Sequence, residues 1–600
     1  MASKFSILLD LVSLPPKVFA ARMAKRFLGK KETEVHLNPQ NGGSLAAMLS
    51  SNSSISVDQK TKDYLIEKFS ASRVDVLGSG WFEWKGEHGI RWQHDPVASF
   101  DWNIDLPSSS QLGLGLSVPE ADVKRPWELA RFQHFTQWLA ITEHKDSGNQ
   151  QIADEFQFWV EDFLKSNPIG MGVHWMNAME VAIRAMNWMV ITDIFRHRGI
   201  TVSTEIETAI RQHIDFVFNH LERKEGLGNN HYLANLVGLL FGLIYFPDWK
   251  ELHEKSEWIT DEFTRESKKQ FYSDGGNFEG SMYYHKLGSE LLILGTAALS
   301  RLGHERGKSE VGEITQSAMT FMRTIVKPNG ELPDFGDNDS GSIFSFSPSG
   351  EWTTAGEYIQ NGKSTAAVFE MYKGLIGEGD SLESIFIKNL ALLELKEVAS
   401  PKKDVHVDKH RTFKHSNKHE WVLHVELNPT ELKYTYFPIT GIVVCKSDTF
   451  YLAMSLLTRD GAHRYRGHFH NDQLSVEIWA NGKDLVLDPG TYTYTGDMEI
   501  RNAMRSAKAH NGPYWGVEPN PFLPGLLGLF HQKIESKCEL LEIGEGKITA
   551  LLSHRGFEAV RDIHITENGV RIIDSSNKPF EVNEGLVEFK AVGYGRRKVE

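Results

Sequence analysis

Four short polar clusters hold the side chains from which a catalytic site could be built. The first is Gly-Asn-Asn-His at residues 228–231, and the second is a glycine-bearing loop at residues 274–285. Asn230 and His231 open an apolar helical pattern, and the free amide hydrogens at a helix N-terminus favour anions. Tyr284 near the end of the second cluster is a candidate for proton transfer. Each pattern alone also fits ordinary structure, a helix cap and a turn with aromatic packing.

The third and fourth clusters are rich in histidine and arginine and occupy residues 463–472 and 501–511. In an extended backbone His468 and His470 point to the same side because side chains alternate, so both could face one cavity. Concentrated arginine in a chain of net charge −14 predicts a local anion site. The candidate substrate-binding residues are Arg464, Arg466, Arg505 and Tyr492. A solvated loop and a charged surface stretch are the structural alternatives.

Two histidines and an aspartate form a candidate metal site. His470, Asp488 and His510 offer two imidazoles and a carboxylate, which suits zinc with a fourth position for water or another group. They are separated by 18 and 22 residues, so no compact motif supports the site. His468 is then left for acid and base chemistry. We expect no organic cofactor.

The composition describes a folded chain without an excess of positive charge. It is 40% hydrophobic and 24% charged over 600 residues, which is ordinary globular usage. With 65 basic and 79 acidic side chains, its net charge of −14 argues against nucleic-acid coating and against an anionic-membrane surface role. Two cysteines, Cys445 and Cys538, cannot build a disulfide framework, so core burial must supply the stability.

The N-terminal stretch bears on the location of the protein. An apolar run from Phe5 to Leu14 is interrupted by Asp10 and followed by two prolines, with no small-residue cleavage site. This pattern predicts neither a standard signal peptide nor a membrane span, and elsewhere no uncharged apolar run reaches spanning length. On the sequence alone we expect a cytoplasmic protein.

Hydrophobic periodicity divides the chain into a helical part and a strand part. From about residue 126 to 395, apolar residues recur at three- and four-residue spacing, as in a layered helical array. After about residue 400 the pattern is that of strands, with hairpin turns at Asn481-Gly482 and Asn568-Gly569. Helices first and strands afterwards predict segregated domains and exclude alternating βαβ topology. The expected divisions are an N-terminal extension and linker at 1–75, with its serine-bearing stretch at 44–56, a helical domain at 76–400 and a strand domain at 401–600.

These clusters, in this order, resemble the heparinase II/III family of polysaccharide lyases, which also includes alginate lyases of similar architecture. The family pattern is an Asn-His pair opening a helix, a Tyr-His ending a glycine-bearing loop, His-x-His-x-Asp, Asp-Pro-Gly-Thr-Tyr and Ala-His-Asn. In this chain the pattern stands at residues 230–231, 284–285, 468–472, 488–492 and 509–511. Upstream, residues 167–188 resemble the family's helical signature through Asn167, Trp175, Glu180, Arg184 and Asn187. The resemblance covers roughly residues 120–515.

The resemblance implies an α+β multidomain chain in which an incomplete (α/α) toroid is followed by an antiparallel β-sandwich. It also implies β-elimination on a uronate-containing polysaccharide such as a glycosaminoglycan, giving 4,5-unsaturated ends, and a periplasmic or secreted location. The implied catalytic residues are Asn230, His231, Tyr284 and His468. The implied zinc is structural, bound by His470, Asp488 and His510, and would hold the loop that carries His468. Phe469 stands where the family has glycine, and we expect this ring to narrow the cleft.

Elimination from a 4-linked uronate begins at C5, whose proton is weakly acidic because the neighbouring carboxylate is already charged. Asn230 is suited to donate to that carboxylate, with His231 or Arg464 helping. Tyr284 is the candidate base, acid or both in turn, and we expect a nearby cation to lower its pKa from the usual value of about 10. His468 is the complementary acid or base from the strand domain, so the site would lie between the domains.

Two functions other than a lyase are kept as alternatives. A uronate C5-epimerase begins with the same proton abstraction, and a non-catalytic polysaccharide-binding or biosynthetic accessory protein could use the same scaffold. New unsaturated ends would mark elimination, whereas solvent-deuterium uptake without chain cleavage would mark epimerisation. The expected partner is an acidic polysaccharide or oligosaccharide, with no nucleic acid and no membrane span.

Overall fold

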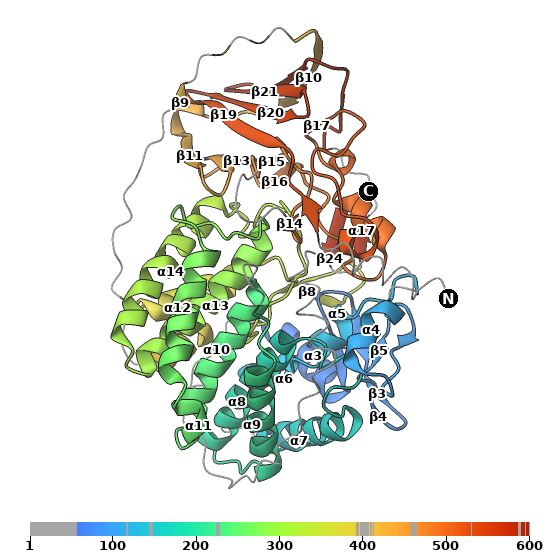
Figure 1. Cartoon of the computed structure of the whole chain (residues 1–600), viewed down its shortest axis with the longest axis vertical. Coiled ribbons are helices and arrows are strands. Elements are labelled where there is room, and N and C mark those ends of the chain that lie inside the picture. Colours follow the sequence, from blue (N-terminus) through green and yellow to red (C-terminus); the bar gives the residue numbers. More distant parts are fainter. Residues whose placement is uncertain are drawn as a thin grey trace, which may run out of the picture.

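The structure is a computed structural model that describes residues 57–115, 118–142, 148–223, 229–391, 415–457, 465–529 and 531–585, with the short pieces 395, 407–408, 411, 413, 590–593 and 596–598. The N-terminal stretch, the predicted linker at 44–56, Arg464 and most of the predicted boundary near residue 400 lie outside the described residues. Within the described part, helices occupy one half of an elongated molecule and strands the other (Figure 1).

The helical half is layered. Its inner helices are buried around nearly their whole circumference and neighbour one another in the order α8 (Ala178–His197), α10 (Asn230–Tyr245) and α13 (Met282–Arg301). Outer helices bury one face each against them: α9 (Thr204–Asn219), α12 (Ser256–Gln270) and α14 (Glu305–Ile325). A helix that is apolar all round needs cover on every side, and this is why two layers form. The layering is that of the predicted incomplete (α/α) toroid.

Shorter elements complete the helical half. The other helices are α3 (Gln59–Ser70), α4 (Ser108–Gly115), α5 (Lys124–Leu129), α6 (Gln133–Ile141), α7 (Gly148–Ser166), α11 (Lys250–His253), α15 (Ala366–Leu375) and α16 (Leu382–Ala391). Four antiparallel pairs of short strands among the described residues are β1 (Arg73–Asp75) with β2 (Trp81–Glu83), β3 (Lys85–Gly86) with β4 (Gly89–Ile90), β5 (His94–Asp95) with β6 (Phe100–Asp101), and β7 (Gly350–Trp352) with β8 (Tyr358–Gln360).

Helix α3 and strand β1 belong to the helical half rather than to a linker. Leu65 and Phe69 of α3 are buried in the core of this half, and α3 packs against α6. The packing of α3 extends the helical core to residues before 75, and the predicted domain bounds stay a prediction. The stretch before residue 75 is polar in composition, so the sequence did not reveal its amphipathic helix. The apolar face of that helix is buried in this core.

The strand half is a sandwich of two antiparallel sheets, as predicted. The first sheet has the strand order β10 (Asn417–His424), β22 (Gly569–Ser576), β21 (Phe557–Thr566), β20 (Lys547–His554), β19 (Lys537–Gly544) and β9 (Val407–Asp408). The second has the order β11 (Lys433–Phe437), β12 (Ile442–Lys446), β13 (Phe450–Ser455), β15 (Val476–Ala480) and β16 (Lys483–Val486). The two sheets share one apolar core, to which β13 contributes Leu452 and β20 contributes Leu552.

Smaller elements border the sandwich. They are the strand pairs β14 (Tyr465–Arg466) with β18 (Gln532–Lys533), β17 (Pro513–Tyr514) with β23 (Glu581–Val582) and β24 (Lys590–Gly593) with β25 (Arg596–Lys598), and the helix α17 (Met498–Met504).

Both predicted hairpins are present. Asn481 and Gly482 join β15 to β16 with φ values of 49° and 87°, the left-handed conformation that a tight hairpin turn requires. Strands β21 and β22 are paired as far as Thr566 and Gly569, so residues 567–568 form the second turn.

The two halves are joined by apolar and charged contacts. Phe437 and Tyr451 of the five-stranded sheet belong to the same core as the toroid helices. Lys327, just after α14, is buried and places its ammonium nitrogen 3.1 Å from a carboxylate oxygen of Glu477 on β15. Breaking a buried pair leaves an uncompensated charge, which costs about 3–5 kcal/mol, so the halves are fixed relative to each other.

Phe469 lies in this interface and not in a cleft. Its side chain is 2% exposed and packs against Gly280, where a Cβ atom would lie 2.1 Å from the ring. Gly280 also has a φ of +71°, which favours glycine. The expectation that Phe469 narrows the substrate cleft is therefore wrong, because a glycine on the opposing loop makes room for the ring inside the interface.

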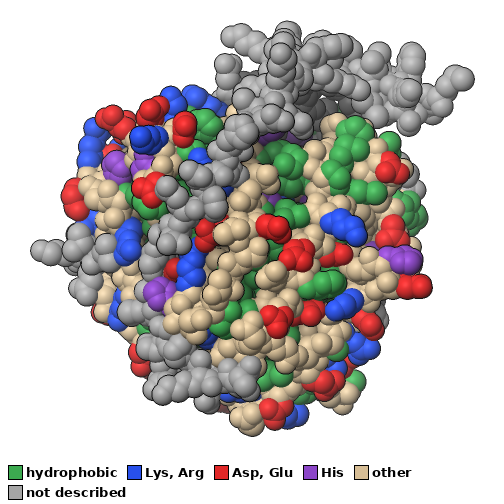
Figure 2. Space-filling view, turned by 90° about the horizontal axis from the view of Figure 1, so that it is seen from below, with side chains coloured by type: hydrophobic (Ala, Val, Ile, Leu, Met, Phe, Trp, Pro, Cys, Tyr) green, Lys and Arg blue, Asp and Glu red, His purple; other side chains and the backbone are tan. Residues whose placement is uncertain are grey.

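The surface agrees with the overall composition. Among the described residues, none of the helices combines the length and the apolar character that crossing a membrane needs. Acidic and basic side chains are interspersed over the end of the helical half that Figure 2 shows. This face therefore offers no concentrated positive patch that would attract an acidic ligand.

Gly280→Ala is expected to loosen the interface. The added methyl group meets the Phe469 ring and the positive φ together, and overpacking of this kind costs about 1–3 kcal/mol. We expect a lower midpoint of thermal unfolding, measured by calorimetry. Gly482→Ala is the matched control, because its φ is also positive while no atom lies within 4 Å of an added Cβ. Equal shifts for the two variants would contradict this account.

Candidate active site

A buried carboxylate, Asp337, joins the two halves at the site. It follows α14, and Arg501 of α17 donates from Nη2 to its Oδ2 at 2.8 Å. His468 Nδ1 lies 3.1 Å from Oδ2, and His470 Nε2 lies 3.0 Å from Oδ1. Burial raises the pKa of Asp337, but Arg501 and the two imidazoles outweigh burial and hold it well below its usual value. Both histidines thus face one carboxylate, in agreement with their predicted alternation.

Tyr284 lies in the first turn of α13, against His468. Ser281 caps this helix by accepting from the Tyr284 N–H at 3.1 Å. The phenol and imidazole rings are stacked, with centroids 3.7 Å apart and planes 17° apart. The Tyr284 hydroxyl donates to Asp339 Oδ2 at 3.0 Å and accepts from the Tyr494 hydroxyl at 2.7 Å. A phenol of the helical half and an imidazole of the strand half therefore meet.

The pKa of Tyr284 is raised well above its usual value, first by burial and then by the negative charge of Asp339. The expected lowering by a nearby cation is wrong. The ammonium of Lys124 does lie close by, but it is paired with Asp339 at 2.7 Å, so its charge is already compensated. Tyr284 is consequently a neutral phenol in this arrangement.

A second phenol, Tyr494, completes the cluster, and sequence reasoning missed it. Its hydroxyl lies 2.7 Å from His468 Nδ1 and 3.1 Å from Asp337 Oδ2. The predicted binding residue Tyr492 stands two positions earlier, in the same Thr-Tyr-Thr-Tyr segment. That repeat is the signal that could have found Tyr494, because alternate residues of an extended segment share a side.

Asp122 of the helical half fastens the segment that carries Tyr494. Its carboxylate accepts from the backbone N–H groups of residues 494–496 at 3.0 to 3.3 Å. It also accepts from the hydroxyls of Thr493 and Thr495. The position of the Tyr494 phenol is thus set from the helical half, although the residue belongs to the strand half.

Asn230 reaches the same cluster from the first turn of α10. It is 2% exposed, and its backbone N–H donates to Glu279 Oε1 at 2.8 Å. The other oxygen of Glu279 lies 3.2 Å from His468 Nε2. Neither the Oδ1 nor the Nδ2 of Asn230 has a hydrogen-bond partner among the described residues. An unsatisfied buried amide costs about 1–3 kcal/mol, which a bound ligand would recover.

His231 points to a different partner. Its side chain is 33% exposed, and its Nδ1 lies 2.9 Å from Glu222 Oε1. The Glu222 carboxylate also accepts from Met179 N–H and so anchors the start of α8. A role for His231 in substrate binding stays a prediction.

The predicted anion-binding arginines have internal partners where their side chains are described. Arg501 is paired with Asp337, and Arg505 is 1% exposed and donates to the carbonyl oxygens of Phe469, Gly528 and Leu529. Arg464 and the side chain of Arg466 lie outside the described residues. The structure thus favours a role for Arg505 in holding the neighbouring loops. Substrate binding by Arg464 and Arg466 stays a prediction.

The predicted metal ligands are together. His470, Asp488 and His510 are all buried, and their ligand atoms lie within 4.8 Å of one another. His510 Nδ1 is 2.7 Å from Asp488 Oδ2. His470 Nδ1 and His510 Nε2 are buried without a hydrogen-bond partner among the described residues. Two orphaned imidazole nitrogens beside a carboxylate are a donor set that fits zinc.

Comparison with known proteins decides the family. The profile described as Heparinase II/III N-terminus matches residues 44–347, just over half of the chain, and the profile Heparinase II/III-like, C-terminal, matches residues 430–513. The chain belongs to the heparinase II/III family.

Two curated relatives are named heparin-sulfate lyase. The protein of Bacteroides stercoris is 23% identical over 421 residues, which is 66% of this heparinase II/III chain and 54% of the relative. The protein of Pedobacter heparinus is 25% identical over 230 residues, which is 37% of this chain and 34% of the relative. The chain thus spans about half and a third of these relatives. A solved structure described as heparinase III aligns with 96% of this chain and 79% of its own, at a TM-score of 0.55 and 14% identity, which supports the fold.

The helical signature of this heparinase II/III chain positions the loop that carries Asp339. Glu180 pairs with Arg131, whose Nη1 donates to the Ser342 carbonyl at 3.0 Å. Asn187 Nδ2 donates to the carbonyl of Ile343 at 2.9 Å. Two residues of the signature therefore act on the loop behind Tyr284. The other three, Asn167, Trp175 and Arg184, bond to their own surroundings inside the toroid.

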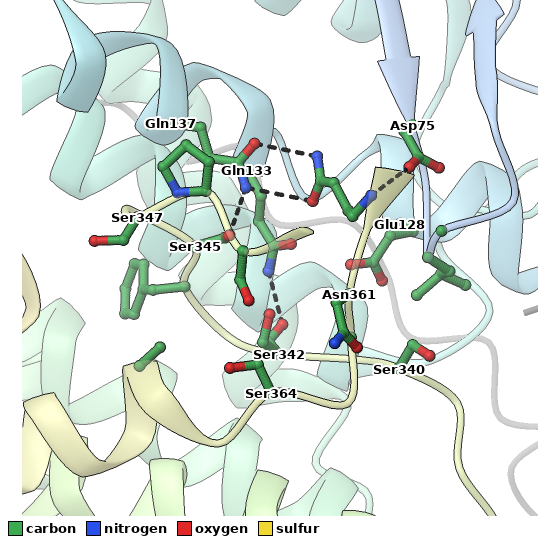
Figure 3. Close-up of a pocket in the computed structure, with 18 of the residues that line it drawn as sticks. Asp75, Glu128, Gln133, Gln137, Ser340, Ser342, Ser345, Ser347, Asn361 and Ser364 are labelled. Atoms are coloured by element: carbon green, nitrogen blue, oxygen red, sulfur yellow. Dashed lines mark hydrogen bonds between the residues drawn. The ribbon is translucent and has the colours of Figure 1, made fainter. Parts of the chain in front are cut away.

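A cavity of about 230 Å³ lies behind this loop (Figure 3). Its polar side chains bond mainly to one another or to the backbone: Gln137 donates to Ser345 Oγ, Gln133 to the Ser342 carbonyl, and Gln360 Nε2 to Gln137 Oε1. The Lys286 ammonium donates to the carbonyl of Gly362 at 2.6 Å. This mutual pairing describes a polar support for the loop rather than a place for chemistry.

Asp337→Ala is expected to destabilise the protein strongly. It leaves Arg501 buried without its carboxylate, and removing one partner of a buried pair costs about 3–5 kcal/mol. The measurement is the midpoint of thermal unfolding. Asp105→Ala, at an exposed aspartate, is the control and should leave the midpoint unchanged. A midpoint for Asp337→Ala equal to that of the control would show that Asp337 does not hold the halves together.

Proposed function

We propose that this chain is a polysaccharide lyase that cleaves a uronate-containing acidic polysaccharide by β-elimination and leaves 4,5-unsaturated uronate ends. One observation carries the proposal: a buried Asn230 amide, without a hydrogen-bond partner among the described residues, lies in one cluster with the Tyr284 phenol and the His468 imidazole. The names of the two relatives support a glycosaminoglycan as the substrate.

Binding of the uronate carboxylate is the role we assign to Asn230. Its Nδ2 has no acceptor within the described part of the chain and lies at the N-terminal turn of α10, where the helix also favours negative charge. A donor to the carboxylate stabilises the enolate that forms when the C5 proton leaves, and one such donor contributes about 3–4 kcal/mol at comparable oxyanion sites. Without it the C5 proton would be too weakly acidic to remove.

Proton transfer is the role we assign to Tyr284. In the reacting form the Tyr284 hydroxyl has given its proton to solvent, because Asp339 is paired with Lys124, which outweighs burial, holds the pKa of Asp339 far below the usual value and makes it too weak a base to take that proton. The phenolate oxygen then accepts the C5 proton. The same oxygen then protonates the leaving O4 as the C4–O4 bond breaks and the C4–C5 double bond forms, which regenerates the phenolate. The net result is transfer of the C5 proton to O4. Positioned transfer of this kind contributes about a hundred- to ten-thousand-fold.

His468 complements Tyr284 in this proposal. Burial lowers the pKa of His468, but hydrogen bonds to Asp337 and Glu279 outweigh burial and raise it. A protonated imidazole stacked on the Tyr284 ring would stabilise the transient phenolate and the enolate beside it. The rings come from different halves, so the reaction requires both.

Tyr284→Phe is the direct test of the function. The variant removes the transferring oxygen, so formation of unsaturated ends should fall at least about a hundredfold. The measurement is the ultraviolet absorbance of the conjugated product, with heparan sulfate, hyaluronan, chondroitin and alginate as substrates. Tyr283→Phe is the matched control, because that neighbouring buried phenol donates only to the Leu332 carbonyl among its described hydrogen bonds. Deuterium uptake at C5 without cleavage by the wild-type protein would instead identify an epimerase.

We further propose that His470, Asp488 and His510 hold a structural zinc ion. The support is the pair of orphaned imidazole nitrogens next to Asp488. When bound, the ion would supply a fixed point for the segment that carries His468, two residues before His470, and no step of the reaction runs through it.

Metal analysis tests this site without reference to activity. We expect about one zinc per chain by elemental analysis, and a lower midpoint of thermal unfolding after chelation. His510→Ala should abolish zinc retention, whereas His88→Ala, at an exposed histidine, should not. Full stability of a metal-free preparation would contradict a structural role.

A further inference from the structure

Glu279 makes contacts that neither the metal site nor the proposed reaction explains. It lies on the loop before α13 and is 6% exposed. Its Oε1 accepts the Asn230 N–H at 2.8 Å, and its Oε2 lies 3.2 Å from His468 Nε2. One carboxylate therefore contacts the residue that we assign to uronate binding and the imidazole that we assign to charge stabilisation, and these belong to different halves of the protein.

We propose that Glu279 is a positioning residue that fixes Asn230 and His468 relative to each other, so that both face the same sugar. The catalytic consequence of this inference rests on the proposed function. Its structural consequence does not.

At the Asn230 end, Glu279 replaces a missing helix cap. The first N–H groups of a helix have no partner within the helix, and a side chain at the N-cap normally accepts from them. Asn229 occupies the N-cap position of α10 but makes no side-chain capping bond. Glu279 accepts from the first turn instead, so the entry of α10, and with it the direction of the Asn230 side chain, depends on a residue of another loop.

At the His468 end, Glu279 contacts the second of the two nitrogens of the imidazole ring. Asp337 and Tyr494 contact Nδ1, at 3.1 and 2.7 Å. These contacts alone would leave the opposite edge of the imidazole free to swing away from α10. With Glu279 at Nε2 the ring is held at both nitrogens, and its stacking on Tyr284 is fixed at the same time.

Glu279 is itself held firmly. Its backbone N–H donates to Asn277 Oδ1 at 2.9 Å, and the next residue is Gly280, which packs under the Phe469 ring. Phe469 directly follows His468, so the same loop touches the strand half at two adjacent residues. Both oxygens of the Glu279 carboxylate are occupied, and its negative charge would repel a uronate. These features suit positioning rather than substrate binding.

The test compares Glu279→Ala with Glu279→Gln. The amide of glutamine keeps the size of the side chain, but its one oxygen can accept from either Asn230 N–H or the protonated His468 Nε2–H and not from both, whereas alanine removes both contacts. Glu257→Ala, at an exposed glutamate of α12, is the control. Two quantities are measured for each: amide hydrogen exchange by mass spectrometry in peptides covering residues 229–235 and 467–474, and kcat and KM on the substrate that the wild-type protein cleaves.

We expect Glu279→Ala to speed exchange in both peptides and to lower kcat about 10–100-fold, the usual effect of losing a residue that orients a functional group, with KM changed less than kcat. Glu279→Gln keeps one of the two contacts, so it should lie between the wild-type protein and Glu279→Ala in both measurements. Wild-type exchange in Glu279→Ala, or a Glu279→Gln variant as impaired as Glu279→Ala in both measurements, would overturn the inference. If the exchange result holds but the wild-type protein makes no unsaturated ends, positioning stands and the lyase proposal fails.

Discussion

A single buried charge, that of Asp337, is the constraint on which the site depends. Removing a carboxylate from water costs several kcal/mol even after relaxation, and only close partners offset this cost. The partners are Arg501, His468 and His470, which belong to the strand half, whereas Asp337 belongs to the helical half. Docking of the halves and assembly of the histidines are therefore one event. Neither half can hold the geometry of the candidate site without the other.

Other buried carboxylates around Asp337 are also paired with nearby donors. Each of them fixes the position of one component of the cluster. Asp339 binds the Tyr284 hydroxyl and is balanced by Lys124. Asp122 fastens the segment of Tyr494 through backbone N–H groups and hydroxyls. These carboxylates are already paired or hydrogen-bonded, so an acidic chain can present neutral and positive groups to an acidic ligand. The net charge of −14 is that of the whole chain and does not give the charge of this cluster.

Patterns that depend on neighbours in the chain could be predicted from the sequence. The toroid helices and both hairpins follow from periodicity and turn residues, whereas the grouping of Asn230, Tyr284 and His468 was expected only from the resemblance to the heparinase II/III family. The predictions failed for residues whose interacting partner is distant in the sequence. The pKa of Tyr284 depends on how Lys124 is already paired, and the burial of Phe469 depends on a glycine of another loop.

The residues that reasoning from the sequence missed are mainly carboxylates in loops. Asp337, Asp339 and Glu279 carry no spacing that distinguishes them from surface acids, because what makes each of them important is a contact made by the tertiary fold. Arg505 shows the converse. Its type suggested an anion site, but the fold directs its guanidinium to carbonyl oxygens.

The fastening of Tyr494 by Asp122 spans 372 positions of the chain. During synthesis the helical half emerges first and carries Asp122 and Asp337 before most of their donors exist. The helical half therefore cannot complete its packing until the sandwich is translated. Until then its acidic side chains remain hydrated. Transplanting this toroid onto an unrelated sandwich would consequently fail unless the donors that receive its buried acids were transplanted with it.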